Sequence, residues 1–202
     1  FYTVTVVLGV IVISSMAAYA FSRLEFPGKN IIYIVLISTM MIPIPGAFIA
    51  LYVLLNKLQL INTRIGYILP QISAGLALGI FMLKTFFDKL PRDLEDVARI
   101  DGCNKLQVYM HVALPLAKPA IGVLVIFNTL AVWNEYLFAM LVLNNRHLMP
   151  LQRGLIIFQG AHRTEYAVLM AGIAITIFPV IALYLIMQRH IISGISAGAI
   201  KA

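Results

Sequence analysis

Long apolar runs separated by short polar connections make up most of the chain. Five of these runs contain few charged residues and have the length of membrane-crossing helices: 1–22, 31–55, 67–87, 119–143 and 166–188. An α-helix of 22 residues reaches about 33 Å, which exceeds the roughly 30 Å of a bilayer's hydrocarbon core. The pattern therefore predicts an all-α integral membrane protein with five visible transmembrane helices.

Two of the predicted spans contain residues that disturb or tighten helix packing. Pro43, Pro45 and Gly46 fall inside the second span and predict a kink or a partly unwound stretch. Such a break either lines a cavity or serves helix packing, and both interpretations stay open. In the third span, Gly75 and Gly79 form a G-xxx-G pair, which favours the close approach of a neighbouring helix.

The polar segment 91–115 differs from the other connections because it carries its own start and stop signals. Asp93 is a candidate N-cap for a short helix, Gly102 interrupts that helix, and Asn104 is a candidate cap for a second one. Leu114–Pro115 ends the segment before the next apolar run. The predicted structure is a helix, a glycine turn and another helix.

The first of these two short helices has distinct faces. Leu94, Val97 and Ile100 recur at threes on one side, and this side is expected to lie on something apolar. Glu95 and Arg99 stand four residues apart, where they can pair across one helical turn. Their side is expected to face water or a partner.

Composition agrees with a membrane protein and indicates its orientation. Hydrophobic residues make up 61% of the 202 residues and charged residues 11%, which argues against a water-soluble globular domain. The net charge of +7 fits membrane topology better than nucleic-acid binding, because Lys and Arg collect on the cytoplasmic side. Ten basic residues share the side of segment 91–115: Arg23, Lys29, Lys84, Lys89, Arg92, Arg99, Lys105, Lys118, Arg189 and Lys201. Five lie on the other side: Lys57, Arg64, Arg146, Arg153 and Arg163. Segment 91–115 is therefore expected in the cytoplasm and Phe1 outside.

Several kinds of chemistry find no support in the sequence. The chain lacks a G-xxxx-G-K-[ST] phosphate loop, so it is not expected to hydrolyse ATP itself. It also lacks H-E-xx-H and G-x-S-x-G, and we predict no catalytic residue and no enzyme activity. The single cysteine, Cys103, and four scattered histidines suggest no metal site, and no cofactor is expected.

Glu135 is the ionisable residue that stands out within a predicted span. A charge near the centre of a span costs about 2.5 to 3.5 kcal/mol, so such residues usually face a bundle interior or a water-filled path. The candidate substrate path comprises Glu135 and its neighbours at helical spacing or in sequence: Asn128, Trp133, Asn134 and Tyr136. The alternative is an interfacial Glu135 held by Trp133 or by another helix.

Segment 91–115 resembles the EAA loop of binding-protein-dependent ABC importer permeases. The match runs through Asp96-Val97-Ala98, Gly102 and the ending Val112–Pro115, with the family's spacing kept. Asp96 stands where the family has Glu, and Val97 where it has Ala. Further segments resemble the carbohydrate-importer branch of the maltose-transporter inner-subunit type: 17–23, 26–30, 41–43, 60–70, 133–135 and 197–201.

The resemblance implies a single transmembrane permease domain, 1–202, in the inner (cytoplasmic) membrane of a prokaryote. Such permeases have six core helices, so the N-terminal helix would precede Phe1. The implied partners are a second permease subunit, two ATP-binding subunits that hold the ATP, an external solute-binding protein and a sugar substrate. The loop 144–165 would face the binding protein, and the cytoplasmic tail 189–202 would lie near the ATPases, with 196–201 as a weaker contact.

The resemblance also assigns roles within the EAA loop. The helix from Asp93 to Asp101 would be the coupling helix that inserts into a groove on the ATPase. The residues assigned to this coupling are Asp93, Glu95, Asp96, Val97, Ala98, Arg99, Ile100, Asp101, Gly102 and Pro115. Glu95 and Asp96 would meet basic or amide donors, Val97, Ala98 and Ile100 would pack, and Gly102 would allow the turn. Whether Glu95 or Asp96 makes the main acidic contact stays open.

Other functions are weighed against this one. A permease for amino acids or phosphate shares the EAA pattern and differs only in the wider resemblance. A self-contained secondary transporter or channel would use the broken second span and Glu135 for ions or substrate, and it would need no ATPase.

Overall fold

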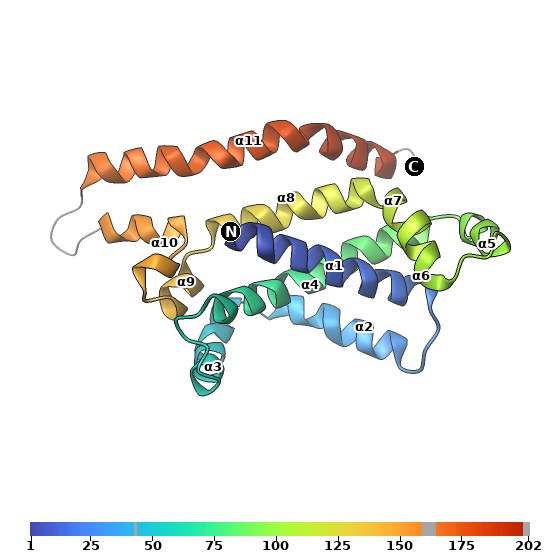
Figure 1. Cartoon of the computed structure of the whole chain (residues 1–202), viewed down its shortest axis with the longest axis horizontal. Helices are drawn as coiled ribbons and strands as arrows, with labels where there is room; N and C mark the ends of the chain where they lie inside the picture. Colours follow the sequence, from blue (N-terminus) through green and yellow to red (C-terminus); the bar gives the residue numbers. More distant parts are fainter. Residues whose placement is uncertain (43, 159–164, 200–202) are drawn as a thin grey trace. The chain divides into compact units, whose positions relative to one another are not determined.

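The computed structural model describes the backbone of residues 1–42, 44–158 and 165–199, which is helical almost throughout (Figure 1). The α-helices are α1 (Tyr2–Arg23), α2 (Lys29–Ser38), α3 (Ile44–Lys57), α4 (Arg64–Lys89), α5 (Asp93–Ile100), α6 (Lys105–Val108), α7 (Leu114–Leu116), α8 (Lys118–Asn134), α9 (Leu137–Val142), α10 (Leu151–Leu155) and α11 (Tyr166–Ala199). Short 3-10 helices lie at Thr39–Met41, Arg146–Leu148 and Ile156–Phe158, and a π-helix at Tyr109–Ala113. Among the described residues there is no β-strand, so the all-α prediction is confirmed.

Helix α1 matches the first predicted span within one residue, and α4 covers the third and extends a few residues beyond it at both ends. Both helices are long and apolar enough to cross a membrane. Two further pairs of helices meet the same criterion if each bent pair counts as one span. One pair joins Lys29–Met41 to Gly46–Lys57, and the other joins Lys105–Leu116 to Lys118–Asn134. In the described residues, length and composition therefore support two to four spans, with a shorter apolar helix at Tyr166–Ala182.

The remaining predicted spans differ from the structure in detail. The second span is divided between α2 and α3, as its prolines and glycine predicted, although Pro43 itself lies outside the described residues. The fourth span is not one helix, because α8 ends at Asn134 and α9 begins at Leu137. The fifth helix does not end at Gln188, since α11 continues to Ala199 through the predicted tail. Residues 159–164 of the predicted external loop and 200–202 of the tail lie outside the described residues.

Contacts divide the chain into two compact units. Unit 1 comprises Phe1–Val7, Ile42–Ala74 and Ile126–Gln188, and unit 2 comprises Leu8–Met41, Gly75–Val125 and Arg189–Ala202. Neither unit is a continuous stretch of sequence, and the single domain expected from the sequence stays a prediction.

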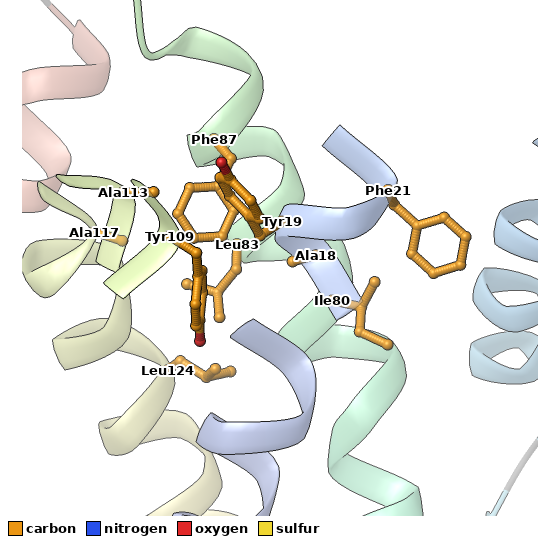
Figure 2. Close-up of a cluster of buried hydrophobic side chains, with 10 residues drawn as sticks. All are labelled: Ala18, Tyr19, Phe21, Ile80, Leu83, Phe87, Tyr109, Ala113, Ala117 and Leu124. Atoms are coloured by element: carbon orange, nitrogen blue, oxygen red, sulfur yellow. The ribbon is translucent and has the colours of Figure 1, made fainter. Parts of the chain in front are cut away.

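The core of unit 2 is formed by α1, α4, the π-helix and the beginning of α8 (Figure 2). Its buried residues are Ala18, Tyr19, Phe21, Ile80, Leu83, Phe87, Tyr109, Ala113, Ala117 and Leu124. The ring of Tyr19 meets the rings of Phe87 and Tyr109 at centroid distances of 5.7 and 5.2 Å (Figure 2). Aromatic pairs at these distances contribute about 0.5–1.5 kcal/mol beyond the area that they bury. Tyr19 is thus fixed between α4 and the π-helix.

Gly79 lets α1 approach α4 closely, which is the behaviour that the G-xxx-G pair predicted for this position. A Cβ atom on Gly79 would lie 2.8 Å from both Cβ and Oγ of Ser14. Ser14 is completely buried, and its hydroxyl has no hydrogen-bond partner among the described residues. The contact therefore depends on small side chains on both helices, not on a polar interaction.

Within unit 1, Asn62 connects the loop between α3 and α4 to the end of α9 by hydrogen bonds. Its Oδ1 accepts hydrogen bonds from the backbone N–H groups of Asn144 (3.0 Å) and Asn145 (2.8 Å). Its own N–H donates to the carbonyl of Val142 at 2.8 Å. Its φ of 64° lies in the left-handed region, which asparagine tolerates better than most residues. The side chain of Asn62 therefore holds two backbone N–H groups just after α9, and its backbone N–H holds the carbonyl of the last residue of α9.

Substitution of Asn62 by alanine is expected to lower the free energy of unfolding by about 1–2 kcal/mol, through the positive φ and the lost acceptor. Asn62→Asp is the matched control, because it keeps an acceptor oxygen and tolerates the same backbone conformation. Chemical unfolding in detergent, followed by circular dichroism, measures both variants. Equal losses in the two variants would contradict the role of the acceptor oxygen.

Candidate functional site

Helix α5 begins at Asp93, so this residue is not the N-cap that the sequence predicted. The capping position is Arg92, which has helical backbone angles and makes no side-chain capping hydrogen bond. Asp93, Glu95 and Asp96 all lie in the first turn, where carboxylates interact favourably with the positive end of the helix dipole. The start of α5 is therefore favoured by charge, without a capping hydrogen bond.

The two faces of α5 are the reverse of what helical periodicity alone predicted. Leu94, Val97 and Ile100, which were expected to pack on an apolar surface, are 45%, 57% and 84% exposed. Glu95 and Ala98 are the buried residues of the helix. The outer face of α5 is therefore an apolar ridge, defined here as Leu94, Val97 and Ile100, on an otherwise polar connection.

Glu95 is bound within the protein by residues of α1. The Arg23 Nε donates to Glu95 Oε1 at 2.6 Å, and both side chains are 5% exposed. The Tyr19 hydroxyl donates to Oε2 of the same carboxylate at 3.2 Å. Arg99, the partner predicted from spacing, lies farther away, with its Nη2 3.8 Å from Oε2. The predicted pair therefore exists, but Arg23 is the main partner.

Asp96 remains at the surface beside the apolar ridge. Its carboxylate Oδ1 accepts a hydrogen bond from Arg99 Nη1 at 3.2 Å, and its side chain is 61% exposed. Asp93 and Asp101 are also exposed, whereas Ala98 faces inward. Of the two acidic residues that the sequence left as alternatives, Asp96 is the one at the surface.

The turn after α5 has the structure that the sequence predicted. Gly102 has a φ of 88°, and nothing lies within 4 Å of the position of a Cβ, so conformation alone favours glycine here. Asn104 caps α6 in a reciprocal arrangement with Gln107: Asn104 Oδ1 accepts from the Gln107 N–H at 2.9 Å, and Gln107 Oε1 accepts from the Asn104 N–H at 2.8 Å. Pro115 is exposed in the first turn of α7.

Glu135 lies in the break between α8 and α9, not inside a continuous helix. Its Oε1 accepts from the Phe138 N–H at 2.6 Å, and its Oε2 accepts from the Ala139 N–H at 3.2 Å. The Tyr67 hydroxyl of α4 donates to Oε2 at 3.2 Å. Glu135 thus binds free N–H groups at the start of α9 and links this helix to α4. This arrangement corresponds to the alternative of a glutamate held by another helix, with Tyr67 in place of Trp133.

The other residues of the candidate path have different surroundings. Trp133 donates its Nε1–H to the carbonyl of Thr176 in α11 at 3.1 Å. Asn134 is exposed, and its side-chain amide donates to the Leu130 carbonyl at 2.9 Å. Tyr136 is 42% exposed, while Asn128 is buried. Since α8 ends at Asn134, the helix that was predicted to place Asn128 on one face with Glu135 and Tyr136 is interrupted before the last two residues.

Substitution of Glu135 by alanine is expected to reduce stability by about 1–2 kcal/mol, because the N–H groups of Phe138 and Ala139 and the Tyr67 hydroxyl lose their acceptor. Glu135→Gln retains one acceptor oxygen, so its loss of stability should be smaller than that of Glu135→Ala. Thermal unfolding in detergent, monitored by circular dichroism, measures the difference. Wild-type stability of Glu135→Ala would contradict the capping role.

Unit 1 also contains a cavity of about 510 Å³ that only partly coincides with the predicted path. Trp133 lines it, together with Tyr2, Arg64, Tyr67 and His147, whereas Glu135 and Tyr136 do not. The volume falls within the range of small-molecule sites, and the lining combines aromatic rings with the polar side chains of Thr3, Arg64 and His147. Sequence reasoning missed Arg64 and His147, because they belong to different polar connections and only folding brings them together.

Comparisons with known proteins agree on one family. The model of the binding-protein-dependent transport system inner membrane component matches residues 9–197. The chain is 33% identical over 199 residues to the arabinooligosaccharides transport system permease protein AraQ of Halalkalibacterium halodurans, which covers 98% of this chain and 71% of the relative. It is 33% identical over 197 residues to the trehalose/maltose transport system permease protein MalG of Thermococcus litoralis, and this match covers 97% of this chain and 71% of the relative.

A solved structure gives the same result. A chain in the crystal structure of a bacterial ABC transporter involved in the import of the acidic polysaccharide alginate matches with a TM-score of 0.82 and 28% identity. The match covers 94% of this chain and 71% of that chain. The protein therefore belongs to the family of inner membrane components of binding-protein-dependent transport systems, the permease subunits of ABC importers.

Proposed function

We propose that this permease imports a sugar or an oligosaccharide across the cytoplasmic membrane of a prokaryote, driven by ATP hydrolysis on partner subunits. Its partners would be a second permease subunit, two ATP-binding subunits and an external solute-binding protein. The named relatives support the substrate class, because arabinooligosaccharides, trehalose, maltose and alginate are all carbohydrates. The charge distribution supports a cytoplasmic position for the loop around α5.

The observation that carries this proposal is the apolar ridge on α5. Val97 and Ile100 lie exposed on a loop that the charge distribution predicts to be cytoplasmic, and no described part of the chain covers them. Such side chains gain free energy when a partner groove removes them from water. Asp96 and Arg99 flank the ridge, so a groove with polar rims fits this face. In this proposal Val97, Ile100 and Asp96 contact the ATPase. Glu95 and Ala98 are buried and hold α5 against the rest of the chain.

Gly102 and Pro115 would then delimit the moving segment. When the ATP-binding subunits close on ATP, they would displace α5, and α4 and α8, which flank the segment in sequence, would follow as rigid bodies. This is alternating access, in which a ligand on another chain shifts the population of two conformations. Trp133 and the cavity that it lines are the candidate substrate-facing part of this chain, with Glu135 supporting α9 nearby.

Reconstitution tests this proposal directly. The chain should purify as a complex when it is expressed with its permease, ATPase and binding-protein partners. In proteoliposomes this complex should take up a labelled oligosaccharide only when ATP is present on the side of the membrane where the ATP-binding subunits lie. Uptake driven by an ion gradient, without any ATP-binding subunit, would indicate the secondary transporter instead. Uptake of an amino acid or phosphate in place of sugar would correct the substrate class.

A further inference from the structure

A buried ion pair joins the start of α5 to the end of α1. Arg23 is the last residue of α1, and Glu95 lies in the first turn of α5. Their side chains meet at 2.6 Å, and each is 5% exposed. The arginine lies at the negative end of one helix dipole and the glutamate at the positive end of another, so both charges are favoured by their own helices.

Each of the two charged groups makes a further hydrogen bond. Arg23 Nη2 donates to the carbonyl of Leu90 at 2.7 Å, in the turn between α4 and α5. Tyr19 donates to the second oxygen of Glu95, and its ring belongs to the core of unit 2. A buried ion pair is tolerated when its remaining donors and acceptors are satisfied, and removal of one partner leaves a costly unpaired charge. The inner face of α5 is therefore held to α1 by an ion pair with additional hydrogen bonds to both charged groups.

Helix α1 is in turn held to the neighbouring elements of unit 2. The hydroxyl groups of Ser15 and Tyr109 lie 2.8 Å apart, which ties α1 to the π-helix. Ser22 donates to Asp88 of α4 at 2.6 Å. A displacement of α5 would therefore pull on the cytoplasmic end of α1 as well as on the helices that are next to α5 in sequence.

We propose that Arg23 and Tyr19 are positioning residues that make α1 part of the coupling unit, with the Arg23–Glu95 pair transmitting the displacement of α5 to the first helix. This inference rests on the proposed function, since it assumes that an ATPase displaces α5. It assigns Glu95 an internal role and leaves the docking contact to the apolar ridge and Asp96.

Two single variants, Glu95→Gln and Arg23→Met, test the pair in the reconstituted complex. Glu25→Gln is the matched control: Glu25 makes the same kind of ion pair with Lys29 at 3.0 Å, but its side chain is 84% exposed. Exposed pairs of this kind contribute little. Hydrogen exchange of the α5 amides should become at least about 100-fold faster in both variants, and it should be unchanged in the control.

Transport measurements separate positioning from a purely structural role. Uptake per ATP hydrolysed should fall about fivefold or more in Glu95→Gln and Arg23→Met. The double variant should be no worse than either single variant, because the two residues act through one contact. A purely structural role would lower uptake and ATP hydrolysis in proportion, and an unchanged ratio would overturn the proposal.

The exchange result keeps this inference separable from the proposed function. If the wild-type complex shows no ATP-driven sugar uptake, the proposed function fails, while faster α5 exchange in both variants still supports the link to α1. Unchanged exchange in both variants overturns the link whatever the substrate is.

Discussion

Replacement of Ile100 by aspartate is expected to abolish ATP-driven uptake while the chain remains folded and inserted. The side chain is 84% exposed, so the substitution removes no described contact within the chain. In a partner groove, however, an unpaired carboxylate costs several kcal/mol, which corresponds to a loss of affinity of more than about 100-fold. Co-purification of the ATP-binding subunits and uptake in proteoliposomes measure this loss.

Leu106→Asp provides the control for this prediction. Leu106 is 60% exposed on α6, in the same loop, and it is not among the proposed coupling residues. The same charge at this position should leave most of the uptake intact. Full uptake by Ile100→Asp would refute docking through the apolar ridge, and equal loss in both variants would indicate that the whole loop is sensitive.

Replacement of Gly79 by valine is expected to disrupt the packing of unit 2. The new Cβ would lie 2.8 Å from Ser14 and 3.3 Å from Leu124 Cδ2, and both neighbours are completely buried. Neither the Ser14 Cβ nor the backbone of α1 can move aside without separating the two helices. Overpacking of this kind costs about 1–3 kcal/mol. The midpoint of thermal unfolding and the yield of folded protein should both fall.

A compensating pair of substitutions identifies the contact responsible. Gly79→Ala alone should destabilise the protein, and addition of Ser14→Gly should restore much of the loss, because it removes the Cβ and Oγ that collide. Ser14→Ala should change little, since the serine hydroxyl has no described partner. A Gly79→Ala variant with wild-type stability would contradict close packing at this position.

Local signals in the sequence predicted the glycine turn after α5 and the Asn104 cap of α6. The positive φ at Gly102 and the reciprocal cap of Asn104 and Gln107 follow from residues within four positions of each other. The same holds for the division of the second span between α2 and α3. Such features depend on backbone stereochemistry and on short hydrogen bonds, which a short stretch of sequence specifies.

The orientation of α5 could not be predicted in this way. Periodicity identifies that a helix has two faces, but it does not say which face the rest of the protein covers. The residue that decides this is Arg23, 72 positions before Glu95, and its burial with the carboxylate turns the apolar face outward. An apolar stripe usually marks the core, and in a subunit of a larger assembly it also marks a contact with a partner.

The surroundings of Glu135 illustrate a second limit. Trp133, Asn134, Glu135 and Tyr136 lie in an apolar run, and residues 123–143 of this run contain no helix-breaking proline or glycine. The helix nevertheless ends at Asn134, and the Glu135 carboxylate binds the first free N–H groups of α9. This use of the charge depends on Tyr67 and on the packing of α9, which are tertiary features.

The turn at Gly102 has a consequence for chemical substitution. Because open space surrounds the position of its Cβ and only the sign of φ is restricted, the site selects handedness and not size. A D-amino acid with a large side chain would fit where L-alanine is strained, since its mirror-image stereochemistry favours positive φ. Among the genetically encoded residues, glycine alone has no preference for negative φ, because it lacks a Cβ atom. The absence of this one atom therefore determines the path of the chain from α5 into α6.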